Sequence, residues 1–326
     1  MKETGPETEP AGTAANSGWK RAWRSQDVWI TIALFMVTVL SRLPFRTSLL
    51  YSWDSILYAR ALDHFDVTLQ QPQPPGHIYY VALVWLVDQL AGDPNAAMVW
   101  ISVFSSAVAV AALCWLGLTM FGRRAGLLAA LWLATSLSFW THSEVTLPYA
   151  LLGLLSVVVA AVIYQTWQGK KGYVLPAALV LGLASGFRQD LLFFLLPLFA
   201  IGLRGVPLRG IIKAVLVLLA AILSWYVPSA LFSGGFTSYY EASSAQSSFL
   251  ITSSSVIGND GLAALSSNVT TLGHFFFWAA AGTLPLIGAL TVILPLRWSR
   301  FKNRPLLFLA VWALPRLAFY IFIHIC

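Results

Sequence analysis

The stretch AMVWISVFSSAVAVAALCWLGLTMF (97–121) contains no charged residue and exceeds the about 20 apolar residues that a helix needs to cross a bilayer. Apolar runs of this kind recur along the chain. Of its 326 residues, 58% are hydrophobic and 10% are charged, whereas a soluble domain carries about 25% charged residues. The mean hydropathy is +0.74. The composition therefore predicts an all-α polytopic membrane protein.

Nine segments reach or approach the length of a membrane span. They are 28–43, 97–121, 125–140, 147–167, 174–187, 190–203, 211–232, 271–296 and 305–325. A tenth apolar segment, 78–91, has the sequence IYYVALVWLVDQLA. Its length suits a helix lying on the membrane interface better than a helix crossing it.

The basic residues decide whether 78–91 counts as a span, because cytoplasmic loops are enriched in Lys and Arg. If it is left out, most basic residues fall on one side with the N-terminus. The groups on that side are Lys20/Arg21/Arg24, Arg123/Arg124, Lys170/Lys171, Arg204/Arg209/Lys213 and Arg297/Arg300/Lys302/Arg304. If it is counted, the later groups lie opposite the N-terminal flank. Nine spans with a cytoplasmic N-terminus are therefore predicted, with loops 44–96 and 233–270 outside.

The net charge of +7 comes from short basic runs between apolar segments. Such a pattern indicates which loops are cytoplasmic, and it does not indicate nucleic-acid binding. Residues 1–25 are predicted to form a disordered cytoplasmic tail, and 26–326 one transmembrane domain. Cys114 and Cys326 give neither a disulfide framework nor a metal-binding spacing.

The first outer loop contains YSWDSILYARALDHFDVTLQQPQPPGHIYY (51–80), which is acidic and rich in proline. Ser52 is a suitable N-cap residue for an amphipathic interfacial helix with Asp54 in its first turn. Ile56, Leu57, Ala61 and Phe65 would share one face. Asp54 is either a functional acid or a charge that merely complements the helix dipole.

The segment QPQPPGH (71–77) is predicted to be extended, because a residue before proline avoids the helical region. Such a segment between two interfacial helices would hold polar groups over a cavity. His64 and His77 are candidates there, although a histidine is more often a satisfied polar residue than a catalyst.

Two outer corners carry further charges. THSEVTLP (141–148) holds Glu144 near the bilayer boundary, where an ionisable group is costly unless it has a function. SGFRQD (185–190) joins two segments too short to cross the bilayer, so it should line a recess below the outer surface. Arg188 would bind a phosphate there and Asp190 would orient it. Alternatively, Arg188 and Asp190 form an internal pair that only fixes the corner.

Arg316 lies within ALPRLAFY in the last predicted span. A charge at this depth usually faces protein or a cavity, although simple snorkelling toward the outer surface is the alternative. His324 would emerge on the same side.

The Ser-rich loop 233–270 is predicted to be either a plain connector or a flap with Tyr239, Tyr240 and Glu241 near its hinge. Asn268 begins an NVT sequon, which matters only in a host that glycosylates proteins.

The order of these motifs resembles the GT-C superfamily of membrane glycosyltransferases. The motifs are YSWDSILYARAL, QPQPPGHIYYV, FGRRAG, HSEVTLPYALLG, and GFRQD followed by LLFFLLPL. The resemblance covers about residues 25–326. It is greatest to the branch of protein O-mannosyltransferases, aminoarabinose transferases and bacterial glycosyltransferase family 39 proteins.

The resemblance implies a GT-C-type helical bundle in a bacterial plasma membrane with its active site on the outer face. It implies a polyprenyl-phosphate-linked sugar donor, with membrane lipids as the other partners. Asp54 matches the family's catalytic base or metal partner. The residues expected to bind substrate are Tyr58, Gln73, His77, Glu144, Arg188, Asp190 and Arg316. A divalent cation is the one candidate cofactor, with Asp54 and Glu144 as candidate ligands.

Two departures from the family pattern stand out. Leu147 precedes Pro148 where relatives often have an acid, so Glu144 would substitute from one turn earlier. Many relatives also continue well beyond this length, so the chain is expected to be a short or truncated form.

The sequence contains no nucleotide-binding glycine motif, which agrees with a lipid-phosphate donor. Asp54 would take a proton from the acceptor, and Arg188, with Arg316, would stabilise the departing polyprenyl phosphate. A single displacement with inversion is then expected from the resemblance. The alternatives are a transporter of a polar or lipid-linked solute and a non-catalytic scaffold. A transporter predicts inverted repeats and helices interrupted at the midplane, and the sequence shows no repeat.

Overall fold

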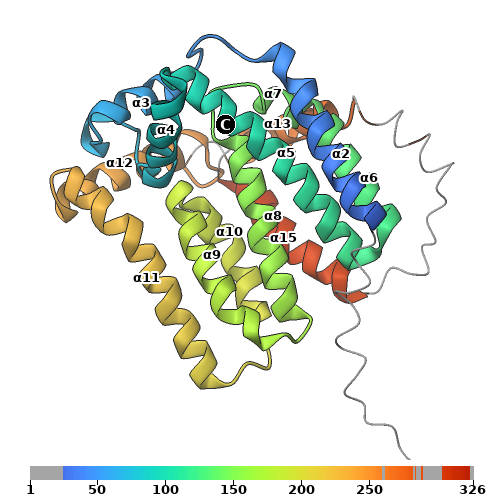
Figure 1. Cartoon of the computed structure of the whole chain (residues 1–326). Coiled ribbons are helices and arrows are strands. Elements are labelled where there is room, and N and C mark those ends of the chain that lie inside the picture. The colour runs from blue at the N-terminus through green and yellow to red at the C-terminus, as the bar shows by residue number, and fades with distance from the viewer. Residues whose placement is uncertain (1–24, 259–260, 282, 284–287, 289–302, 324–326) are drawn as a thin grey trace, which may run out of the picture.

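The computed structural model describes residues 25–258, 261–281, 283, 288 and 303–323. Within these residues every regular element is a helix, so the all-α prediction is confirmed (Figure 1). The α-helices are α2 (Ser25–Arg42), α3 (Trp53–Asp63), α4 (Ile78–Ala91), α5 (Pro94–Phe121), α6 (Arg123–Thr135), α7 (Leu137–His142), α8 (Tyr149–Trp167), α9 (Val174–Phe187), α10 (Asp190–Gly202), α11 (Leu208–Phe232), α12 (Phe236–Ser254), α13 (Gly261–Ala281) and α15 (Asn303–Phe322). The short 3-10 helices are η1 (Leu43–Phe45), η2 (Val67–Leu69) and η3 (Lys171–Tyr173).

Five of the described helical segments are long and apolar enough to cross a membrane, which is compatible with an integral membrane protein. They are Gln26–Phe45, Pro94–Phe121, Tyr149–Trp167, Leu208–Phe232 and Arg304–Phe322. These five segments fall on five of the nine predicted spans. Three further apolar helices, α4, α9 and α10, are shorter.

The other predicted spans differ from single long helices. The segment 125–140 is divided at Ser136, whose extended backbone (φ −60°, ψ 119°) ends α6 before α7 begins. The segment 271–296 begins inside α13, but half of it lies outside the described residues, as do residues 1–24 of the tail and His324.

The bundle is built around α5, which contacts α2, α4, α6 and α8, and α9 packs against α11. The closest approach of α5 and α6 depends on glycine. A Cβ atom added to Gly126 would lie 2.5 Å from the Cys114 carbonyl oxygen and 2.6 Å from the Leu118 nitrogen. Small residues at such crossings let helix backbones pack closely.

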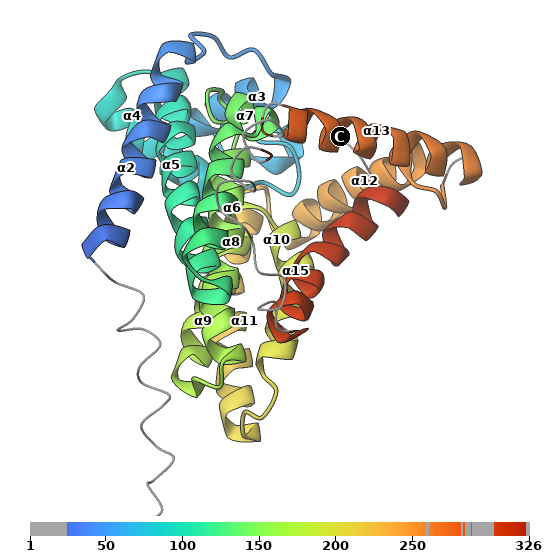
Figure 2. The ribbon, with the colours of Figure 1, turned by 90° about the vertical axis from the view of Figure 1, so that its right-hand side faces the viewer.

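The short helices gather at one end of this bundle. In Figure 1, α3, α4 and α7 lie near the top, and the loops that join α8 to α9 and α10 to α11 lie at the opposite end. Figure 2 shows α15 running obliquely beside α10 toward α13. The polar corners of the sequence therefore meet at the end where α3 and α4 lie.

The segment 233–270 is largely helical, because it contains α12 and the start of α13. Asn268 lies on α13 with 8% of its surface exposed, and its Nδ2 donates to the Ile321 carbonyl at 3.1 Å. In this fold the sequon asparagine is therefore covered by α15.

Replacing Gly126 by leucine should lower the free energy of unfolding by about 1–3 kcal/mol, because the new side chain overpacks the α5–α6 contact. Thermal unfolding in detergent, followed by circular dichroism, measures the effect. Gly172→Leu is the control, since a Cβ there meets no atom within 4 Å. Equal unfolding midpoints for the two variants would contradict this account of the helix crossing.

Candidate active site

Asp54 lies in the first turn of α3. Ser52 is the N-cap residue, as predicted, and its backbone nitrogen donates to the Ser55 hydroxyl at 3.3 Å. The Asp54 Oδ1 atom accepts a hydrogen bond from Gln73 Nε2 at 2.8 Å. This bond joins the helix to the proline-rich segment and fixes the direction of the carboxylate.

The buried face of α3 differs from the predicted one. Leu57 and Ala61 are buried as expected, but Ile56 is 37% exposed and Tyr58 is buried instead. Tyr58 packs its ring edge-on against His77 at 5.7 Å between centroids. The helix therefore directs Tyr58 toward the proline-rich segment.

The segment 71–77 is a compact turn, so the prediction of an extended segment was wrong. Gly76 N donates to the Gln73 carbonyl at 3.1 Å, and Gln70, Gly76 and His77 all have positive φ angles. At Gly76 (φ +107°) a Cβ would lie 2.8 Å from Val67 Cγ2. The left-handed backbone and this close contact fold the segment back on η2, which outweighs the preference of pre-proline residues for an extended chain.

His77 joins this turn to the corner at the end of α9. Its Nδ1 lies 2.9 Å from the Phe187 carbonyl oxygen. Because a carbonyl only accepts, Nδ1 carries the proton and Nε2 is an acceptor in the neutral ring. Burial and the Arg188 charge lower the pKa of His77 to about 4, and the bond to Phe187 opposes them. His77 is therefore neutral near pH 7.

The corner itself holds three charges. Arg188 Nε lies 3.1 Å from Asp190 Oδ2, and Arg316 Nη2 from α15 lies 3.6 Å from the same oxygen. The side chains keep 24–31% of their surface exposed. One carboxylate thus faces two cations, which leaves an excess positive charge accessible to an anion. The predicted ion pair of Arg188 and Asp190 is present, and Arg316 is a third member of the same cluster.

Electrostatics link Asp54 to this corner. Burial raises the pKa of Asp54, while the Arg188 charge and the Gln73 hydrogen bond lower it less strongly. Burial is the largest single effect and acts to lower the pKa of Arg188, but Asp190 and the neighbouring tyrosines together outweigh it, so the pKa is raised. Burial and the neighbouring Asp54 charge raise the pKa of Tyr58. Asp54 therefore combines a raised pKa with an electrostatic interaction with Arg188.

Aromatic residues that sequence reasoning missed cover the two arginines. The Arg188 guanidinium lies 5.8 Å from the centre of the Tyr149 ring, and Arg316 lies 5.2 Å from Phe194. Arg316 Nε also donates to the Tyr320 hydroxyl at 3.0 Å. Tyr149 follows directly after Pro148 in the second outer corner, which was its only signal in the sequence.

A second set of residues, which includes Tyr239 near the predicted hinge, holds the turn against α12. The Tyr239 hydroxyl donates to the Pro75 carbonyl at 2.8 Å and accepts from Gln189 Nε2 at 2.8 Å. Tyr239 is 2% exposed. Nearby, Val67 N donates to Ser233 Oγ at 3.0 Å. Tyr239 is thus a fixed anchor between α12, the turn and the corner.

Glu144 makes its contacts elsewhere. It is 7% exposed, and its Oε1 is buried without a hydrogen-bond partner among the described residues. Burial raises the pKa of Glu144 to about 7, opposed by a hydrogen bond from Trp140 and by the Arg42 charge. Arg42 lies 4.3 Å from the Trp140 ring and donates to the Ala134 carbonyl at 2.7 Å. Glu144 therefore belongs to a buried cluster with Arg42, a residue whose role the sequence did not reveal.

The two candidate metal ligands, Asp54 and Glu144, do not share one cluster. Asp54 contacts Gln73 and Glu144 interacts with Arg42 and Trp140. Over the described part of the chain, no group of three or more His, Cys, Asp or Glu side chains is placed to hold a metal ion. The described residues therefore offer no donor set that fits a divalent cation.

Tyr239→Phe removes the hydroxyl that joins Pro75 to Gln189. A buried hydrogen bond contributes about 1 kcal/mol, so amide exchange across 66–77 should quicken about fivefold. Hydrogen exchange with mass spectrometry measures the change. Tyr240→Phe is the matched control, because Tyr240 is 68% exposed. The same exchange rates in both variants would show that the anchor does not hold the turn.

The raised pKa of Glu144 predicts a pH-dependent stability. Its contribution is fully present below the ordinary value of 4.5 and is lost as the pH rises through about 7. The melting temperature of the wild type minus that of Glu144→Gln should therefore fall between about pH 5 and pH 8. The same comparison for the exposed Glu241 serves as control. A difference that stays constant or grows with pH would refute the buried, protonated carboxyl.

Comparison with known proteins identifies no relative of this arrangement. The chain matches no model of a known protein family, no curated protein and no solved structure. The candidate site therefore rests on the geometry of its own residues. Asp54, Tyr58, Gln73, His77, Arg188, Asp190 and Arg316 come together, whereas Glu144 belongs to a different cluster.

Proposed function

We propose that the chain is a membrane glycosyltransferase of GT-C type that moves a sugar from a polyprenyl-phosphate donor to a hydroxylated acceptor. One observation carries the proposal. A partly buried carboxylate of raised pKa interacts electrostatically with Arg188, which shares Asp190 with Arg316, and the neutral His77 joins the same corner. Asp54, His77, Arg188 and Arg316 come from α3, the proline-rich turn, the α9–α10 corner and α15.

Asp54 is suited to the role of general base. A base works best when its pKa lies near the operating pH, and burial moves the Asp54 pKa in that direction. His77 directs its Nδ1 at the Phe187 carbonyl, and burial and the Arg188 charge lower its pKa to about 4. Gln73 holds one carboxylate oxygen. The other oxygen would accept the proton of the acceptor hydroxyl.

The arginines are suited to the leaving group. In the proposed step the acceptor oxygen bonds to the anomeric carbon while the bond from that carbon to the phosphate oxygen breaks. The bonding electrons stay on the phosphate, and the acceptor proton passes to Asp54. Arg188 and Arg316 would stabilise the added charge on the phosphate. Attack opposite the leaving group inverts the anomeric carbon.

We further propose nine membrane crossings, a cytoplasmic N-terminus and a site on the outer face of a bacterial plasma membrane. α9 and α10 support a recessed site, since 14 and 13 residues span only about 20 Å of a hydrocarbon core of about 30 Å. α6 and α7 would together make one crossing. α3 and α4 would lie at the interface, close to the lipid-borne substrate.

Asp54→Asn should reduce sugar transfer by at least about 100-fold, because the amide cannot accept the acceptor proton. The assay is the release of radiolabel from polyprenyl-phosphate sugars by the protein in liposomes, with hydroxylated lipids, glycans and peptides as acceptors. Asp63→Asn is the matched control, since Asp63 lies exposed on the same helix. Undiminished turnover in folded Asp54→Asn protein would refute the base assignment. Uptake of the lipid-linked sugar without transfer would favour a transporter.

A further inference from the structure

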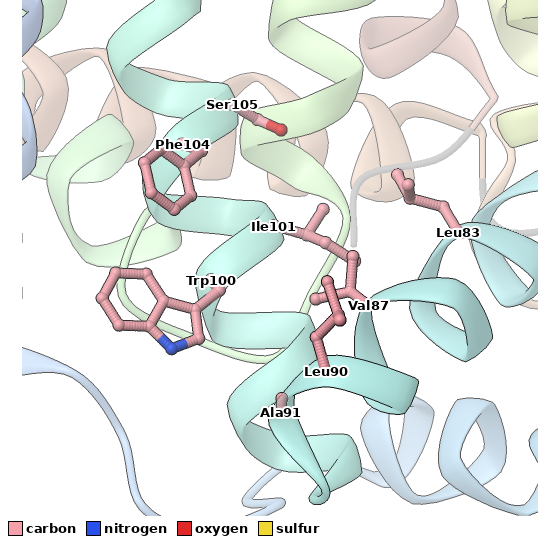
Figure 3. A pocket seen from close by; sticks show the side chains of 8 residues that line it. All are labelled: Leu83, Val87, Leu90, Ala91, Trp100, Ile101, Phe104 and Ser105. Carbon is pink, nitrogen blue, oxygen red and sulfur yellow. The ribbon is translucent and has the colours of Figure 1, made fainter.

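An open apolar groove of about 460 Å³ separates α4 from α5, away from the charge cluster. Leu83, Val87 and Leu90 line it from α4, and Trp100, Ile101 and Phe104 line it from α5. Figure 3 shows Val87 and Leu90 directed across the gap toward Ile101. The volume lies within the range of about 300–1,000 Å³ typical of small-molecule sites. The apolar side chains that line the groove favour a hydrocarbon chain over a polar ligand.

The surface around the groove is also apolar. On α4, Leu86 is 59% exposed and Leu90 is 90% exposed. On α5, Phe104 is 47% exposed. A contiguous apolar surface of this kind is unfavourable in water and marks a lipid or protein contact. In a chain that crosses the membrane, the nearest source of hydrocarbon for it is the bilayer.

A cation lies at the aromatic wall of the groove. The exposed Arg46 guanidinium is 4.8 Å from the centre of the Trp100 ring, which stacks on Phe104 at 5.5 Å. Arg46 Nε donates to the Leu43 carbonyl at 3.0 Å, which holds the guanidinium in place. The nearby acid Asp93 accepts from Ala96 N at 2.8 Å and caps α5. An arginine beside an apolar groove complements an anionic headgroup joined to a hydrocarbon chain.

The groove is separate from the candidate active site. α4 begins directly after His77, and Leu90 lies 12 residues beyond Ile78. At 1.5 Å per residue the lining residues of α4 therefore lie from about 8 Å (Leu83) to about 18 Å (Leu90) along the helix from the turn that contacts the α9–α10 corner. Arg188 lies at the α9–α10 corner and Arg46 lies at Trp100 of α5, so a phosphate bound at one arginine is at a different position from a phosphate bound at the other.

We propose that this groove binds one hydrocarbon chain of an anionic phospholipid of the surrounding bilayer, with the lipid phosphate at Arg46. The inference rests on the proposed membrane location and not on the transfer reaction. It assigns α4 a second role beside positioning His77, because a bound lipid would hold the far end of α4 against α5.

Native mass spectrometry of the protein released from nanodiscs tests the assignment. Discs of phosphatidylglycerol mixed equally with phosphatidylcholine should leave one retained phosphatidylglycerol per chain. Arg46→Gln should lower the preference for phosphatidylglycerol about fivefold, the contribution of one basic residue near an anionic lipid surface. Ala91→Phe should abolish retention, since Ala91 lines the groove and is exposed, so a larger side chain fills the space. Arg209→Gln removes the same charge from an exposed position in α11 and should change nothing.

Equal retention of the two lipids by the wild type would overturn the proposal, as would unchanged retention in Arg46→Gln and Ala91→Phe. Added polyprenyl phosphate that replaces phosphatidylglycerol on the wild type, and that Ala91→Phe does not retain, would assign the groove to the donor and overturn the proposal as well. Lipid retention is read without any transfer assay. Asp54→Asn should retain the lipid like the wild type, so failure of the proposed enzyme and failure of the groove are distinguishable.

Discussion

The ion pair between Arg188 and Asp190 is the interaction on which the site depends. It lies where α9 ends and α10 begins, and Asp190 occupies the first turn of α10, where the helix dipole favours a carboxylate. Arg316 reaches the same carboxylate from α15. A partly buried charge is costly without a partner. The need to pair these charges therefore fixes how α9, α10 and α15 meet.

The same corner also holds the first loop. The Phe187 carbonyl binds His77, and Gln189 binds Tyr239, which in turn binds Pro75. Two corner residues, Phe187 and Gln189, therefore hold the loop, the second of them through Tyr239. A short break between two helices thus positions the proline-rich turn, and through Gln73 it positions Asp54. Backbone carbonyls, as much as side chains, hold these residues from distant parts of the sequence in one site.

Many of the helices could be predicted from the sequence, because apolar runs and N-cap residues depend on neighbouring residues alone. Ser52 caps α3, and five of the predicted spans are long apolar helices. The break at Ser136 and the turn at 71–77 were missed, since both depend on backbone conformations that neighbouring residues do not dictate. Within the site, Arg188, Asp190 and Arg316 were identified because charges are rare in apolar segments. Tyr239 and Arg42 were not identified as site residues, because only their distant partners give them a role.

We propose that Arg188 and Arg316 form one binding site for a lipid phosphate beside Asp54. A cryo-EM map of the protein with a short-chain polyprenyl phosphate tests it most directly. The account predicts phosphate density in contact with both Arg188 and Arg316, with Asp54 open toward it. Density at another position, with the Arg188–Asp190–Arg316 contacts unchanged, would contradict the claim.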